Sequence, residues 1–181
     1  MIINHKYKFM FFAEPHTASR ACSRMLESIE SSELVGEHHM THKAGVERGI
    51  LPAAGYVRFA VIRDPRDIIA GRIARMVNTS KQMGDGPSRS ELIERYVAAH
   101  CVRRNQFEHD YVDYKIRYDK LEPMLYSLLG YIGVDPIPTL GRNPYETTKN
   151  KEPWWEYFSE EQLQRIYENI PEVEQFKVSH A

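Results

Sequence analysis

Residues 56–67, Tyr-Val-Arg-Phe-Ala-Val-Ile-Arg-Asp-Pro-Arg-Asp, change within two residues from an apolar run into a helix start. The Val-, Ile- and aromatic-rich part predicts a strand over residues 56–62. Asp64 is a favourable N-cap, and Pro65 suits the first position of a helix because its fixed φ angle is already helical. A strand that leads directly into a helix is the repeating unit of α/β folds.

The same plan occurs nearer the N-terminus. Residues 7–13 are aromatic-rich and almost continuously apolar, and they are followed closely by Pro15. Such a run is typical of a strand buried on both faces, and we predict it to be the central strand of a parallel sheet. After a polar turn, apolar residues recur at helical spacing between Ala18 and Ile29, which predicts a helix there.

Strands and helices are predicted to alternate through the rest of the chain. The further elements are a helix from Pro65 to a loop at 84–87, a helix capped by Ser88 or Ser90 and running to about His109, a strand over 112–118, a helix over 123–133, a long loop over 135–153, and a helix opened by a capping box of Ser159 and Gln162. This order predicts an α/β, three-layer fold with a central, mostly parallel sheet flanked by helices, in a single domain over residues 1–181.

Composition excludes several classes of protein. The chain has 181 residues and a net charge of -1, which argues against a protein that wraps nucleic acid with a strongly basic surface. Two cysteines are too few for a disulfide framework, so we expect a cytoplasmic protein in a reducing compartment. No apolar stretch reaches 18 residues, and we therefore expect no membrane segment and no export signal.

Two strand-to-helix turns are the best candidates for chemistry, because ligands of parallel sheets bind outside the carboxyl ends of the strands. The first turn, residues 14–20, reads Glu-Pro-His-Thr-Ala-Ser-Arg. Backbone N–H groups at a helix start, small residues and two hydroxyls suit a phosphate or sulfate group. The alternative is a capped helix start with arginine on its solvent side. The pattern GxxxxGK[ST] is absent, so this is not a nucleoside-triphosphate P-loop.

The second turn begins with Arg63, the first residue after a buried strand. Its planar guanidinium could reach a phosphate with two hydrogen bonds. The alternative is an arginine paired with a neighbouring aspartate at a helix end. Because the two turns lie about 45 residues apart in one short domain, together they favour a ligand with two anionic groups.

The two turns resemble the nucleotide-binding motifs of PAPS-dependent sulfotransferases, in particular the short, carbohydrate-modifying type. Residues 11–20 are similar to the family's 5′-phosphosulfate loop, and residues 59–67 are similar to its 3′-phosphate motif, Phe-Val-Arg-Asp/Asn-Pro-x-Asp. Residues 116–121, followed by a helix and Ile-Gly-Val, are similar to its Tyr-Glu-x-Leu segment, and residues 157–159 with the last helix are similar to its C-terminal end.

The resemblance implies a P-loop-like phosphosulfate-binding turn and in-line transfer of a sulfuryl group from PAPS to a hydroxyl or amine acceptor, with no metal required. The residues implied to hold the 5′ group are His16, Thr17, Ala18, Ser19 and Arg20. Arg63 is implied to hold the 3′-phosphate. His16 stands where the family usually has lysine, so it is also a catalytic candidate that can donate an N–H to the bridging oxygen.

The resemblance adds candidates beyond the two turns. Gly71 stands where the family usually has a serine that binds the 3′-phosphate, and Arg72 or Arg75 could compensate. A late basic loop closes over the nucleotide in relatives. The residues that could do so here are Arg142, Lys149 and Lys151. A solvated loop is the alternative for these three.

The general base is predicted in residues 36–43, Gly-Glu-His-His-Met-Thr-His-Lys. The segment from His39 resembles the family's His-Ala-Thr-Ala-like stretch, and histidine accepts a proton near neutral pH. His39 and its neighbour His38 are therefore the candidate bases. Glu14 ranks below them because its charge would oppose binding of an anion. A solvated loop and a metal-binding histidine cluster are the alternatives for this segment.

Two other functions compete with sulfuryl transfer. A non-catalytic module that binds PAPS or its product, adenosine 3′,5′-bisphosphate (PAP), would keep the fold without turnover. A P-loop-type nucleotide kinase would need Mg²⁺ and a lysine on the phosphates, which the sequence does not offer. The predicted partners are a small nucleotide donor and an acceptor of unknown identity, with a sugar as one candidate. So short a chain also allows a homo-oligomer in which a second subunit completes the site.

Overall fold

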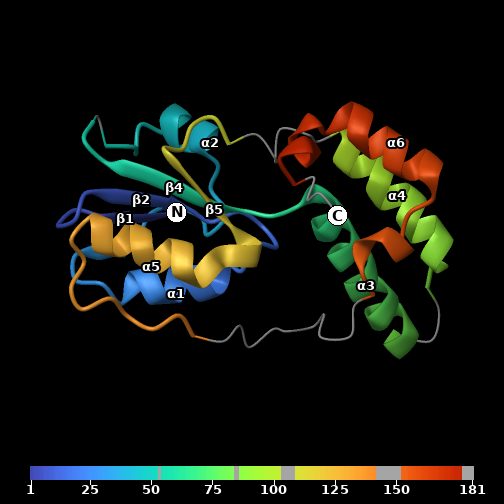
Figure 1. Cartoon of the computed structure of the whole chain (residues 1–181), viewed down its shortest axis with the longest axis horizontal. Coiled ribbons are helices and arrows are strands. Elements are labelled where there is room, and N and C mark those ends of the chain that lie inside the picture. Colours follow the sequence, from blue (N-terminus) through green and yellow to red (C-terminus); the bar gives the residue numbers. More distant parts are fainter. Residues whose placement is uncertain (53, 84–85, 103–108, 142–151, 177–181) are drawn as a thin grey trace. The chain divides into compact units, whose positions relative to one another are not determined.

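The computed structural model describes residues 1–52, 54–83, 86–102, 109–141 and 152–176 (Figure 1). The chain forms two compact units. The sheet unit comprises Met1–Arg63 and His109–Pro144, and the helical unit comprises Asp64–Glu108 and Tyr145–Ala181. Each unit has a hydrophobic core of its own. That the two units together form a single domain over residues 1–181 remains a prediction from the sequence.

The sheet unit contains a five-stranded sheet in the order β3-β1-β2-β4-β5. The strands are β1 (Ile2–Asn4), β2 (Phe9–Phe12), β3 (Ser32–Leu34), β4 (Val57–Ile62) and β5 (Tyr114–Arg117). β2, β4 and β5 pair in parallel, whereas β1 is antiparallel to both β2 and β3. The sheet is therefore mixed, and the mostly parallel arrangement holds for its β2-β4-β5 part. The predicted central position of the aromatic strand is confirmed for β2, but the sheet around it is not wholly parallel because β1 pairs with β2 antiparallel.

Strands β1 and β3 were not predicted from the sequence. Both are three residues long, and the turn before β2 uses Lys8 at φ 55° where a glycine would have signalled a hairpin. Asn4 supplies the missing restraint: its Oδ1 accepts from the Tyr7 amide at 2.7 Å, and its Nδ2 donates to the Glu30 carbonyl at 2.8 Å. These two strands therefore depend on the buried Asn4 side chain and on partners such as Glu30 that lie far away in the sequence.

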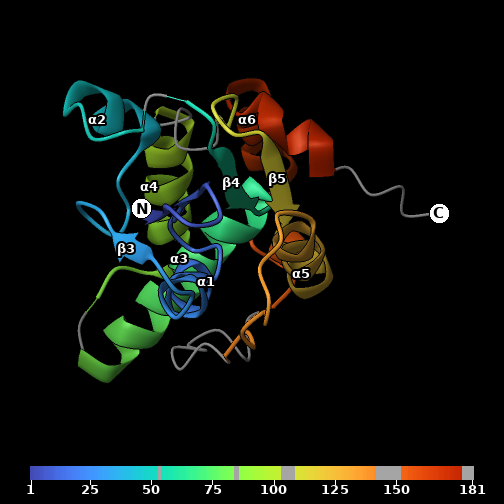
Figure 2. The same cartoon turned by 90° about the vertical axis from the view of Figure 1, so that its left-hand side faces the viewer.

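Helices cover both faces of the sheet (Figures 1 and 2). On one face, α1 (Ser19–Glu27) and α5 (Leu121–Tyr131) pack on aromatic side chains of β2 and β4. On the other face, α2 (His42–Glu47) and its flanking segments pack on a smaller apolar cluster around Met10 and Phe12. The sheet unit is therefore a layered α/β structure, and a short 3₁₀ turn, η2 (Tyr118–Lys120), joins β5 to α5.

The helical unit is built from helices that pack around an apolar core. Its elements are α3 (Pro65–Met83), α4 (Arg89–Val102), η3 (Trp154–Glu156), α6 (Glu160–Asn169) and η4 (Pro171–Phe176). The predicted capping box of Ser159 and Gln162 is confirmed, and the Ser88 hydroxyl accepts from the Glu91 amide at the start of α4. No helix within the described ranges combines the length and apolar character needed to cross a membrane.

Asp64 caps α3 and also neutralises a buried arginine. Its Oδ1 accepts from the Arg66 amide at 2.9 Å, as predicted for an N-cap, and its Oδ2 lies 2.7 Å from Arg66 Nη2. The Arg66 guanidinium also donates to the Tyr167 hydroxyl and lies over the Trp154 ring, and the residue is 4% exposed. For the turn that begins at Arg63, the sequence left open an arginine paired with a neighbouring aspartate. The structure shows such a pair for Arg66, which is buried in the helical unit.

We expect Asp64→Asn to destabilise the protein by about 3 kcal/mol, because asparagine preserves the cap but leaves the buried Arg66 charge without its counter-ion. Urea unfolding measures this difference. The matched control is Glu94→Gln, which neutralises an exposed carboxylate that pairs with Arg165 in the same unit and should have a much smaller effect. Equal losses in the two variants would contradict the role assigned to Asp64.

Candidate active site at the carboxyl ends of β2 and β4

The turn that follows β2 is tightly closed although it contains no glycine. His16 and Ala18 both have left-handed backbone conformations, with φ of 64° and 58°. The Thr17 hydroxyl donates to the Glu14 carbonyl at 2.8 Å, and the Thr17 and Ser19 side chains are buried. The left-handed region costs a non-glycine residue about 1–2 kcal/mol, so surrounding contacts must hold this turn in place.

Helix α1 begins at Ser19 without a side-chain cap. Ala18 is its N-cap residue, and no side-chain hydrogen bond closes the first turn. The alternative of a side-chain-capped helix start is therefore not what the structure shows. The N–H groups of a first helical turn have no acceptor within the helix, and they carry its positive dipole end. Arg20 lies on the exposed side of this turn.

Arg63 connects the two predicted turns. β2 and β4 are adjacent parallel strands, with Phe12 paired to Ala60, so the residues after them meet at one edge of the sheet. Arg63 Nη1 donates to the His16 carbonyl at 2.8 Å, and the guanidinium carbon lies 4.3 Å from the centre of the Tyr118 ring. The arginine thus restrains the strained turn and also contacts the segment that follows β5.

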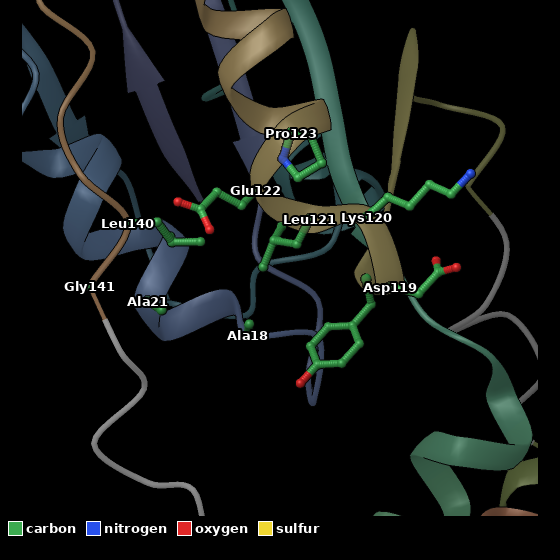
Figure 3. A pocket seen from close by; sticks show the side chains of 10 residues that line it. Ala18, Ala21, Asp119, Lys120, Leu121, Glu122, Pro123, Leu140 and Gly141 are labelled. Carbon is green, nitrogen blue, oxygen red and sulfur yellow. The ribbon is translucent and has the colours of Figure 1, made fainter.

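A cavity of about 450 Å³ opens beside this arrangement (Figure 3). Its wall includes Ala18 and Ala21 from the start of α1, residues 118–123, and the pair Leu140 and Gly141. The side chain of Lys120 extends away from the centre of the cavity in Figure 3. Pockets of about 300–1,000 Å³ are typical of small-molecule sites, and this one borders the uncapped start of α1.

His39 is oriented toward this edge by a backbone carbonyl. Its Nδ1 lies 2.6 Å from the carbonyl oxygen of Ala13, the residue between β2 and Glu14. A carbonyl only accepts hydrogen bonds, so Nδ1 carries the hydrogen and the neutral ring presents Nε2 as its proton acceptor. The structure therefore gives His39 the tautomer that a general base requires.

The neighbouring histidines differ from His39. Burial, followed by the positive charges of His39, the Met1 amino group and Arg20, lowers the pKa of His38, and its buried Nε2 has no hydrogen-bond partner among the described residues. Burial also lowers the pKa of His42, which stacks on Tyr111 with ring centres 4.9 Å apart. Across the described residues, no group of three or more His, Cys, Asp or Glu side chains is arranged to hold a metal ion.

Glu14 is the first residue of the turn, and its carboxylate has a close partner from a distant segment. Its Oε1 accepts a hydrogen bond from the Tyr111 hydroxyl at 2.7 Å. Burial raises the pKa of Glu14, and the Tyr111 hydrogen bond opposes part of that shift. The site therefore places two titratable side chains, His39 and Glu14, beside the chain that follows β2.

The predicted residues divide between the two units. The sheet unit brings together the turn of His16, Thr17, Ala18, Ser19 and Arg20 with Arg63, His38 and His39. Gly71 and Arg72 lie on α3 in the helical unit, where Arg72 Nη1 is 2.8 Å from His100 Nε2. Arg142, Lys149 and Lys151 lie outside the described residues.

Sequence reasoning missed the part played by Tyr111 and by the cavity wall. Tyr111 is 97 residues from Glu14, and no local pattern indicates that pair. The cavity residues after β5 could have been predicted from the sequence, because they follow a strand that is parallel to β4 and therefore lie at the same edge of the sheet. We compared the chain with known proteins, and no family model, curated protein or solved structure matches it.

We expect Ala18→Gly to be neutral or to stabilise the protein by up to about 1 kcal/mol, because glycine adopts the left-handed conformation without steric cost but gains freedom in the unfolded chain. The control Ala98→Gly, at an exposed position inside α4, should lose about 1 kcal/mol. Urea unfolding of both variants tests the difference, and a loss at Ala18 as large as that at Ala98 would show that the turn is not strained.

Proposed function

We propose that this chain is a sulfotransferase that moves the sulfuryl group of PAPS to a hydroxyl or amine acceptor. The observation that carries the proposal is the hydrogen bond of 2.8 Å from Arg63 to the His16 carbonyl. It joins the two sequence motifs that resemble the phosphosulfate and 3′-phosphate sites of that family. Parallel pairing of β2 with β4 brings both motifs to the carboxyl edge of the sheet, where ligands of such sheets bind, and the Arg63 hydrogen bond holds the two motifs together there.

The uncapped start of α1 supports a role in binding the 5′-phosphosulfate. Backbone N–H groups of the first turn, with the positive end of the helix dipole, favour an anion at this position. The N-cap residue Ala18 has no bulky side chain and lines the cavity, so the nucleoside part of the ligand would occupy the cavity beside it. The turn before α1, which contains no glycine, is thus the P-loop-like element of the proposed site.

Charges around the cavity are compatible with a nucleotide. The Asp119 carboxylate is held by Arg117 through two hydrogen bonds of 2.9 Å, so much of its charge is neutralised locally. Tyr118 lines the cavity, and the Arg63 guanidinium stacks on its ring, so a cation lies against an aromatic side chain of the cavity wall. Glu122, in the first turn of α5, suits a hydrogen-bond donor on the ligand better than a phosphate.

His39 is the proposed general base. In an in-line transfer, the acceptor oxygen attacks sulfur, the bond from sulfur to the bridging phosphate oxygen breaks, and PAP leaves. The acceptor loses its proton in the same step, and His39 Nε2 would take that proton. The Ala13 carbonyl stabilises the resulting imidazolium through Nδ1, as an orienting group does for a catalytic histidine.

The first test of the proposal is binding of PAP. We expect PAP to raise the free energy of unfolding by about 2.7 kcal/mol at roughly 100 times its Kd, with no comparable effect of ATP and Mg²⁺. Arg63→Ala should abolish most of this stabilisation, because the 3′-phosphate loses its guanidinium. Arg24→Ala, which removes an exposed arginine from the end of α1, is the matched control and should bind PAP normally. Stabilisation by ATP and Mg²⁺ instead of PAP would favour a kinase.

The second test is turnover, measured as transfer of labelled sulfate from PAPS to panels of carbohydrates and phenols. His39→Asn keeps a donor for the Ala13 carbonyl but removes the base, so we expect transfer to slow by about 10²–10⁴-fold with PAP binding unchanged. His5→Asn, which changes an exposed histidine paired with Glu33, should keep full activity. Binding of PAP without transfer to any acceptor would overturn the catalytic proposal and leave a binding module.

A further inference from the structure

The Glu14 carboxyl is a titratable group that the proposed reaction does not use. Glu14 is the second residue after β2, and its amide donates to the Phe12 carbonyl at 3.1 Å. Its own carbonyl accepts from the Thr17 hydroxyl, so Glu14 and the start of α1 belong to one closed turn. The side chain leaves this turn toward Tyr111, whose hydroxyl donates to Oε1 at 2.7 Å.

Aromatic rings surround the partner of this carboxyl. The Tyr111 ring packs edge-on against Phe12 at 5.0 Å and lies parallel to His42 at 4.9 Å. The His109 ring approaches Tyr111 edge-on at 6.1 Å. Burial accordingly raises the pKa of Glu14, and the raised value is limited by the Tyr111 hydrogen bond.

Several other groups titrate nearby and must be separated from Glu14. His39 reaches the preceding residue through the Ala13 carbonyl, and His16 lies two residues further along the turn. His42 and His109 contact the Tyr111 ring, and the positive charge of Arg58 acts on His42. Each histidine would also gain a proton as the pH falls, so a pH effect alone does not identify Glu14.

A bound anion would add a further constraint on Glu14. Two like charges within one short turn repel, and the repulsion is relieved when the carboxylate accepts a proton. Oε1 is occupied by the Tyr111 hydroxyl, which leaves Oε2 as the atom that accepts the proton. A neutral Glu14 would then let the uncapped helix start act on the anion without opposition.

We propose that Glu14 takes up one proton at Oε2 from solvent when an anionic group binds at the start of α1, so that anion binding and protonation of this carboxyl are coupled. The proposal rests on the proposed function, because it needs the anion site at α1. It predicts that affinity falls by up to tenfold per pH unit between the Glu14 pKa of the free protein and that of the complex.

Isothermal titration of PAP tests the coupling, with the binding enthalpy measured between pH 5 and 8 in buffers of different ionisation enthalpy. We expect the wild-type protein to take up more protons on binding than Glu14→Gln, and the difference should approach one proton. Glutamine keeps the acceptor for Tyr111, so the variant should bind PAP with a flatter pH profile and more tightly at high pH.

Tyr111→Phe separates Glu14 from the histidines. The variant loses the hydrogen bond that holds the Glu14 pKa down, so the window of proton uptake should move to higher pH. A histidine origin predicts no such move. Proton uptake that is identical in the wild type, Glu14→Gln and Tyr111→Phe would overturn this proposal while leaving PAP binding intact. Failure of PAP to bind at any pH would instead remove the anion site, and the proposed function would fall with it.

Stability of the protein without ligand provides a second readout. The folded state holds the Glu14 proton more tightly than the unfolded chain does, so its contribution to stability is fully present below the unfolded pKa. That contribution is lost as the pH rises through the folded pKa. Glu14→Gln should remove this pH-dependent loss, whereas Glu27→Gln, at the exposed end of α1, should keep it. A loss that persists unchanged in Glu14→Gln would contradict the proposal.

Discussion

Parallel pairing of β2 with β4 is the constraint on which the site depends. The pairing of Phe12 with Ala60 brings the residue after each strand to the same edge, where Arg63 reaches the His16 carbonyl. The aromatic side chains that β2 and β4 present to α1 and α5 hold the two strands together by apolar burial. The geometry of the polar edge therefore follows from the apolar core beneath it.

The edge combines opposite electrostatic demands. The start of α1 and Arg63 favour an anion, whereas Glu14 opposes one unless it is protonated. Burial of Glu14 beside Tyr111 moderates that conflict, because it favours the neutral carboxyl. A strained turn without glycine and a half-buried acid are costly features for a helix start that serves only to connect two elements. Their presence together is what makes this edge a functional candidate rather than a simple connection.

Backbone atoms also position the side chains that could handle protons. The Ala13 carbonyl orients His39, and the Glu14 carbonyl closes the turn through the Thr17 hydroxyl. Because both carbonyls belong to the chain directly after β2, the direction of that strand positions His39, the turn and the Glu14 carboxyl together. In the helical unit, side chains have this positioning role. Arg66 pairs with Asp64 at the start of α3 and donates to the Tyr167 hydroxyl of α6.

The sequence by itself determined the elements that are encoded locally: the apolar strands β2 and β4, the Asp64 cap, the capping box of Ser159 and Gln162, and the helix that follows residue 18. These follow from short-range periodicity and cap chemistry. Only the tertiary structure decided the antiparallel β1 and β3, the tautomer of His39 and the partner of Glu14. Each depends on a contact between residues far apart in the chain, such as Asn4 with Glu30 or Glu14 with Tyr111, and no local pattern encodes such a contact.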